Sequence, residues 1–189
     1  MTYFEWLKKG YIFHGLVGTV AEIPKFDDVT NVPTLWNPAD SGKVIIPISI
    51  SVGTAAAATE VIHGLCLNYR KNLGSGVATA APFSVFTEVA TVPMLIGSGK
   101  ASLAKWSPAT NTATAAGTQL LTLGMGLWVE GTPGNSNLYS DMIFKFESML
   151  ALLPGTSISL CSNVATSTTF SSSIVYAELP YLPGDYIIA

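Results

Sequence analysis

Apolar and polar residues alternate along much of this chain, and a period of two residues is typical of β-strands that bury one face. The segment 44–52 shows the pattern most clearly, with Ile46, Ile48, Ile50 and Val52 predicted on one face and Ile45, Pro47, Ser49 and Ser51 on the other. The segments 120–129 and 141–147 repeat it. We therefore expect each of these segments to be a half-buried strand.

Further strands are predicted at 11–22, 60–69, 84–90, 157–162 and 172–179, with a shorter piece at 93–96. Glycine- and proline-rich turn signals separate these segments, and no convincing helical period follows residue 10. About eight strands with this punctuation predict an all-β fold, an antiparallel β-sandwich of jelly-roll type. We expect one domain over 11–189, preceded by a short N-terminal arm over 1–10.

Two kinds of segment fit this scheme less directly. The stretches 55–59 and 107–118 are small, uncharged and rich in Ala and Thr, so we interpret them as long loops. The arm contains Tyr3, Phe4, Trp6 and Leu7 ahead of two lysines. Such a segment either folds back onto its own sandwich or anchors on a partner.

The composition changes this picture by excluding several classes of protein. Of the 189 residues, 49% are hydrophobic and only 11% are charged, with a net charge of −3. The hydropathy excludes a disordered chain, and the longest apolar runs are too short for a transmembrane helix. Nine dispersed Lys and Arg residues disfavour electrostatic binding of nucleic acid. A surface with so little charge suits close contact with neighbouring proteins.

Candidate chemistry is sparse. His14 and His63 lie in strand patterns without further metal ligands at a suitable spacing, so each is expected to be a hydrogen-bonded sheet residue. Cys66 and Cys161 also fall in predicted strands. They could be buried free thiols or form a disulfide across the sheet, and free thiols are favoured. The Gly-Lys pairs at 42–43 and 99–100 lack the rest of a phosphate-binding loop. We predict no catalytic, metal or cofactor site and no enzyme activity.

The segment 33–43, PTLWNPADSGK, reads as a turn that leads into the strand 44–52. Trp36 is expected to cover one end of the sandwich, Asn37-Pro38 to begin the turn, and Ser41-Gly42 to close it. Asn37 or Asp40 is expected to bond local backbone amides.

This segment resembles a motif of jelly-roll virion proteins from tailed bacteriophages and related viruses, in which an L-W-N-P-x-x-S-G-K stretch precedes a strand. The later Leu153-Pro154-Gly155-Thr156, followed by strands up to Glu178, is similar to the last part of that pattern. The resemblance implies a capsid decoration or cement protein that forms a trimer and bridges neighbouring major capsid subunits. It would act on the capsid surface of a virion assembled in the host cytoplasm, without cofactor, nucleic acid or membrane.

Two sets of aromatic and apolar residues are the expected contacts. The capsid anchor is predicted at Tyr3, Phe4, Trp6 and Leu7. The oligomer contact is predicted at Trp106, Trp128, Tyr139 and Tyr176. Two alternatives remain open: a tail-fibre or spike module that binds host carbohydrate, with Trp106 or Tyr139 stacked on sugar rings, and a small single-jelly-roll coat protein.

Overall fold

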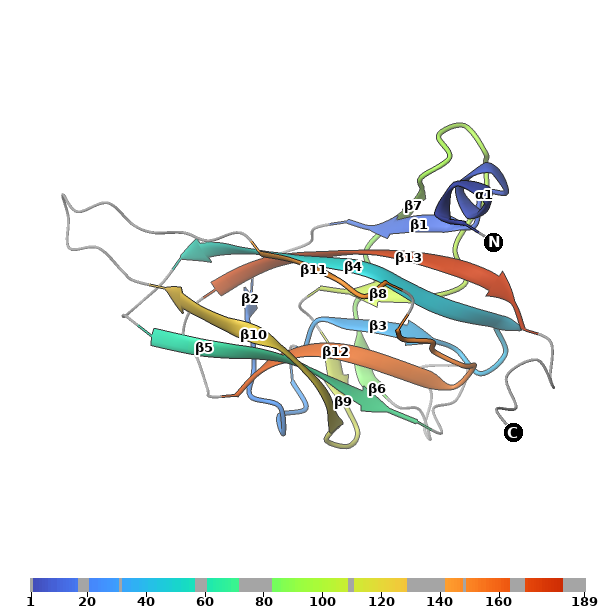
Figure 1. The fold of residues 1–189 in the computed structure, drawn as a ribbon. Helices are drawn as coiled ribbons and strands as arrows, with labels where there is room; N and C mark the ends of the chain where they lie inside the picture. Colours follow the sequence, from blue (N-terminus) through green and yellow to red (C-terminus); the bar gives the residue numbers. More distant parts are fainter. Residues whose placement is uncertain are drawn as a thin grey trace.

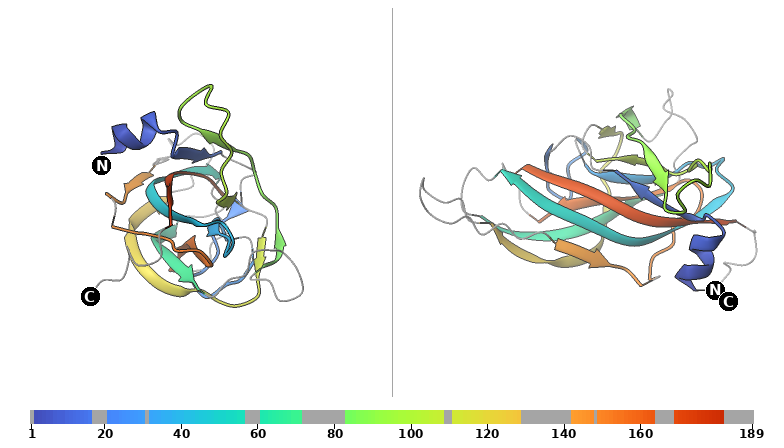
Figure 2. Two further views of the ribbon diagram at one scale, coloured as in Figure 1. Left: turned by 90° about the vertical axis from the view of Figure 1, so that its right-hand side faces the viewer. Right: turned by 90° about the horizontal axis from the view of Figure 1, so that it is seen from above.

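Two antiparallel β-sheets face each other across an apolar core (Figure 1). The structure is a computed structural model, and it describes residues 2–16, 21–30, 32–56, 61–71, 83–108, 111–128, 142–147, 149–163 and 169–181. The all-β sandwich predicted from alternation is therefore confirmed. One helix, α1 (Tyr3–Lys8), lies on the outer side of one sheet at one end of the molecule (Figure 2).

The first sheet, sheet A, has six strands. Its order is β11 (Met142–Lys145), β4 (Lys43–Ala56), β13 (Thr169–Pro180), β1 (Ile12–Gly15) and β7 (Thr91–Pro93), with β2 (Ala21–Glu22) paired to the beginning of β13. Sheet B has five strands, in the order β10 (Thr118–Trp128), β5 (Val61–Arg70), β12 (Thr156–Ser162), β3 (Thr34–Asn37) and β8 (Lys105–Ser107). A small separate sheet pairs β6 (Phe83–Phe86) with β9 (Asn111–Ala113).

The strand pairing is that of a ribbon rolled up on itself. Of the eight strands β1, β3, β4, β5, β10, β11, β12 and β13, the first pairs with the last, the second with the seventh, the third with the sixth and the fourth with the fifth. The pairs β4–β13 and β5–β12 then join these strand pairs into the two sheets. This nested antiparallel order is the jelly roll that the sequence predicts.

The positions of the strands along the chain differ from the sequence expectation in several places. The predicted strand at 11–22 contains two described strands, β1 and β2, which pair at different points of sheet A. The segment 107–118, expected to be a loop, contains β9. The predicted strand at 93–96 is wrong, because β7 ends at Pro93 and the residues after it form an exposed loop. Small polar residues can pair in strands when a neighbouring edge is available, which alternation alone does not reveal.

The alternation along β4 changes phase at Pro47. Ile45, Ile50 and Val52 belong to the core between the sheets, whereas Ile46 belongs to a second apolar cluster on the outer side of sheet A, with Ile48 packed against it. The register supplies the cause: Val175 pairs with Ser49 while Tyr176 pairs with Pro47, so β4 has one extra residue there, a β-bulge. The prediction of a single apolar face from Ile46 to Val52 is therefore wrong.

A proline is tolerated at this central position because the neighbouring chain is interrupted beside it. The ladder between β4 and β11 covers Ser49 to Val52, and the next bridge joins Ile45 to Leu152. Pro47 lies in this gap. No carbonyl of the neighbouring segment therefore needs the backbone N–H that proline lacks.

The segment 33–43 begins as a strand and only then turns. Trp36 belongs to β3, is fully buried, and packs against Phe83 and Phe86 of β6 on the outer side of sheet B. It does not cover an end of the sandwich, as the sequence suggested, because the side chain of the preceding Leu35 takes the inward direction. The chain turns after Pro38, where the Ser41 N–H donates to the Pro38 carbonyl and Gly42 has φ +60°.

Asn37 holds this turn to the rest of the molecule. Its buried Nδ2 donates to the carbonyls of Lys43, at 2.8 Å, and Leu152, at 2.9 Å, and its Oδ1 accepts from the Ser41 hydroxyl. The expected bonds to backbone amides are wrong for this side chain, which donates to carbonyls instead. One amide thus fixes the beginning of β4 against the connection between β11 and β12.

Replacement of Asn37 tests this role. Asn37→Ala removes both donors and leaves two carbonyls without these partners, so the free energy of unfolding should fall by about 2–4 kcal/mol. Asp40→Ala in the exposed part of the same turn is the control and should change it by less than about 0.5 kcal/mol. Urea unfolding followed by tryptophan fluorescence measures both, and equal values for the two variants would contradict this role of Asn37.

Candidate contact surface

The N-terminal helix is defined by residues at its two ends. The Thr2 hydroxyl accepts from the Glu5 N–H, and the Glu5 carboxylate accepts from the Thr2 N–H, at 2.6 Å, which is a capping box. Lys8 in the last turn complements the helix dipole, and Gly10, with φ +64°, lets the chain leave toward β1. The first ten residues thus form a short helix followed by a turn.

This helix folds back onto the sandwich through one side of its sequence. Trp6 is only 8% exposed and packs with Ile12, Val44, Ile46 and Ala177 in the outer cluster of sheet A, and Leu7 packs against this cluster. Tyr3 and Phe4 remain 41% and 62% exposed. Of the four predicted anchor residues, two are therefore used for docking the helix on its own chain, and two face outward.

A loop beside the helix exposes further apolar residues that the sequence analysis did not select. Met94, Leu95, Ile96 and Leu103 all belong to the connection between β7 and β8, and Ile96 is 94% exposed. The loop turns at Gly97 and Gly99, which have positive φ, and the Ser98 N–H donates to the Leu95 carbonyl. Apolar residues immediately before a glycine-rich turn were the signal in the sequence.

The loop and the helix rise from the same end of the molecule, as the end-on view shows (Figure 2). Lys100 of the loop donates through Nζ to the Lys9 carbonyl, and its Nζ lies 4.9 Å from the centroid of the Tyr11 ring. We call the exposed large apolar residues and the exposed lysines of these two segments the end patch. It comprises Tyr3, Phe4, Lys8, Lys9, Met94, Leu95, Ile96, Lys100 and Leu103. Glu5 of the helix is exposed as well.

A buried carboxylate fixes the base of the loop. Glu178, 4% exposed, accepts through Oε1 from the N–H groups of Leu103 and Ala104, at 2.9 and 2.8 Å, and from the Ser102 hydroxyl. Ser102 is also 2.7 Å from the Tyr176 hydroxyl. Burial raises the pKa of Tyr176, so this phenol stays protonated and can share the network. Beside Glu178 lies a cavity of about 290 Å³ that Tyr11, Lys43 and Lys100 also line.

The predicted oligomer contacts do not gather on a surface. Trp106 and Tyr176 are 1% and 0% exposed in the core between the sheets, so the prediction of an oligomer contact is wrong for these two rings. Trp106 also donates from Nε1 to the Leu16 carbonyl, and Gly15 leaves room for its ring, since a Cβ there would lie 2.7 Å from it. Trp128 ends β10, with its side chain outside the description, and Tyr139 lies outside the described residues.

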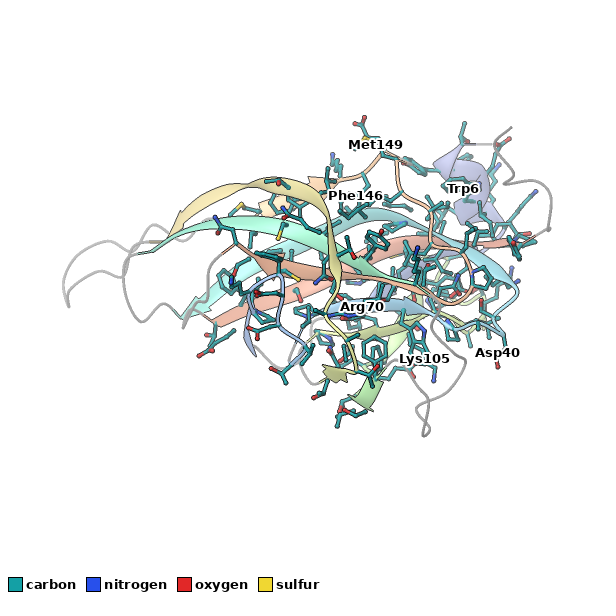
Figure 3. All side chains as sticks on the ribbon, turned by 90° about the horizontal axis from the view of Figure 1, so that it is seen from below. Trp6, Asp40, Arg70, Lys105, Phe146 and Met149 are labelled. Carbon is teal, nitrogen blue, oxygen red and sulfur yellow. The ribbon has the colours of Figure 1, made fainter. Side chains whose placement is uncertain are left out.

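The outer face of sheet B is covered by the chain itself. Arg70, labelled in Figure 3, is buried and donates to the Ala115 carbonyl, at 2.8 Å, and to the Ser159 hydroxyl, at 2.9 Å. Ser159 in turn contacts the Thr34 hydroxyl, and Asn68 donates to the Phe26 carbonyl. Asn68 therefore bonds the segment that precedes β3, and Arg70 bonds the one that follows β9.

The two cysteines are free and buried. Cys66 and Cys161 are directly opposite each other on β5 and β12, beneath Val32 and Phe26. Burial raises the pKa of both thiols, which disfavours the reactive thiolate. His14 lies in β1, and burial lowers its pKa. His63 lies in β5, with its side chain outside the description.

No protein family model matches this chain, and no curated protein or solved structure is significantly similar to it. None of the described helices is both long and apolar enough to cross a membrane. Within the described ranges, no three His, Cys, Asp or Glu side chains gather as a metal site would require.

The division of the anchor residues leads to a stability prediction. Trp6→Ala removes the ring that holds α1 on sheet A and should lower the free energy of unfolding by about 3 kcal/mol. Phe4→Ala on the exposed side of the same helix is the matched control, with an expected change below about 0.5 kcal/mol. Thermal and urea unfolding measure both, and a Trp6 variant as stable as the Phe4 variant would show that the helix does not dock.

The buried thiols give a chemical prediction. In native protein at neutral pH, a thiol reagent such as dithionitrobenzoate should modify Cys66 and Cys161 at least about 100-fold more slowly than in urea, because modification requires opening of the sheet. Two thiols per chain should react once the chain is unfolded. Rapid labelling of either cysteine in the native protein would contradict the burial described here.

Proposed function

We propose that this chain is a non-enzymatic structural protein of a virus particle, a capsid decoration protein that forms a trimer and bridges neighbouring coat subunits. The observation that carries the proposal is the end patch, on which a sandwich with few charges exposes several large apolar side chains at one end of the molecule. Exposed apolar side chains gathered in this way are typical of protein interaction sites. The phage-like segment 33–43 supports the choice of particle.

The chemistry of the described residues supports a binding role over catalysis. The buried carboxylate of Glu178 is bonded to the base of a loop, the thiols are sealed under apolar side chains, and the Arg70 guanidinium bonds carbonyl and hydroxyl oxygens. The Glu178 and Arg70 side chains thus hold one segment of the chain against another, and the thiols are buried. What remains accessible at this end of the molecule is apolar surface, lysine ammonium groups and the exposed Glu5.

The energetic argument for a decoration protein is burial repeated over a lattice. Apolar area removed from water contributes about 25 cal/mol per Å², although ordering and lost mobility reduce the affinity that results. A trimer that engages several coat subunits at once gains avidity from each additional contact. A modest apolar patch on each subunit is therefore sufficient for stable attachment.

Two measurements test this function. Size-exclusion chromatography with light scattering should give three times the chain mass of 19.9 kDa at micromolar concentration, because the proposal requires a stable trimer. Coat shells of the virus that encodes this chain, assembled without it, should bind the purified protein and become more resistant to heat.

A soluble monomer that leaves the shells unchanged would contradict the proposal. Binding of the monomer to a glycan array, lost in Tyr11→Ala, would instead support the carbohydrate-binding alternative, with the cavity beside Glu178 as its site. Trp106, one of the two rings expected to stack on sugars, is buried, so that expectation is wrong for it, and Tyr139 lies outside the described residues.

A further inference from the structure

The end patch has an internal order that constrains its partner. Tyr3 and Phe4 lie at the beginning of α1, and Lys8 and Lys9 lie at its end. Lys100 of the neighbouring loop donates to the Lys9 carbonyl at the end of the helix. The exposed Leu95 and Ile96 belong to the same loop as Lys100. Two apolar ridges thus flank a group of lysines, with both segments standing above sheet A (Figure 1).

Both ridges are held in place before any partner arrives. Trp6 packs α1 on the outer cluster, the Met94 N–H donates to the Ile12 carbonyl, and Glu178 fixes the other end of the loop. A surface that is already ordered loses little conformational entropy when it binds. The patch therefore has the rigidity expected of a docking surface.

The lysines of the patch lack acidic partners. Among the described residues, Lys8, Lys9 and Lys100 form no ion pair, and the nearby Glu5 carboxylate already accepts from the Thr2 N–H. The Lys8 ammonium lies 4.5 Å from the centroid of the Phe4 ring. At this end of the molecule, the exposed Lys8, Lys9 and Lys100 outnumber the exposed Glu5 and the buried Glu178, although the whole chain carries −3.

We propose that the end patch docks on an acidic protein surface in which carboxylates lie between two apolar pockets. This inference rests on the proposed function, in which that surface belongs to a coat subunit. Carboxylates facing Lys9 and Lys100 would satisfy the cations, while one pocket receives Phe4 and the other receives Leu95 and Ile96. Complementary charge at the centre of an interface fixes its register and speeds association.

A lipid surface fits this order less well. If both ridges entered a bilayer, the lysines between them would be pushed toward hydrocarbon, where a charge is costly. Membrane-binding segments instead place their cations at the polar rim, outside the apolar side chains. The central position of Lys100 therefore favours a protein partner.

The experiment compares matched variants on the same coat shells. Leu95→Ser/Ile96→Ser removes one ridge, and Lys100→Gln removes the central charge. The controls are Leu120→Ser, at an exposed position of β10, and Lys71→Gln, at the exposed position that directly follows β5. Circular dichroism and thermal unfolding check that each variant keeps the fold. Binding to shells is measured between about 50 and 200 mM NaCl, and binding to vesicles of phosphatidylcholine and phosphatidylserine in about a 3:1 ratio is measured in parallel.

The expected result is a loss of shell affinity of about tenfold or more for each end-patch variant, with both controls equal to the wild type. Lys100→Gln should also reduce the salt dependence of binding. Wild-type binding that neither end-patch variant weakens would overturn this inference and leave the proposed function standing. Vesicle binding that is lost in Leu95→Ser/Ile96→Ser would overturn it in favour of a membrane. No wild-type binding to shells would overturn the proposed function and this partner together.

Discussion

The β-bulge that follows Pro47, which shifts the alternation between Ile48 and Ile50, is the constraint on which the end of the molecule that carries α1 depends. Without the extra residue in β4, Ile46 and Ile48 would share a face with Ile50, and sheet A would have no apolar outer cluster at this end. With the bulge, one strand supplies both the core between the sheets and the platform for Trp6. The position of α1, and with it half of the end patch, follows from this local change in register.

The scarcity of charge has a different meaning on the two sheets. On sheet B, Asn68 and Arg70 donate to carbonyls of the covering segments, and the hydroxyls of Thr34 and Ser159 bond each other within the sheet. Much of that neutral surface is thus internal. Low charge in the sequence therefore reflects intramolecular packing on sheet B, whereas the apolar residues of the end patch remain exposed.

Much of the fold could be predicted from local pattern, and less of the candidate site. The strands around Ile50, Leu65 and Leu160 were predicted because each alternates against a buried face. Trp36 was predicted in a turn because Asn37-Pro38 is a turn signal, yet strand pairing with β12 continues through Asn37. Large aromatic rings such as Trp106 suggest surface contacts in a sequence, but a ring's exposure depends on the elements that cover it, which adjacent residues do not specify.

The sequence by itself determined the class of the fold, the approximate strands and the neutral character of the chain, because backbone pleating and side-chain polarity are local properties. Tertiary structure alone decided which face of each strand is buried and which aromatic residues remain accessible. It packed Trp6 against sheet A and left Phe4 at the surface, and it brought Lys100 to Lys9 across 91 positions of the sequence. These outcomes depend on a bulge and on pairings between distant strands, whose energies arise only once the sheets are assembled.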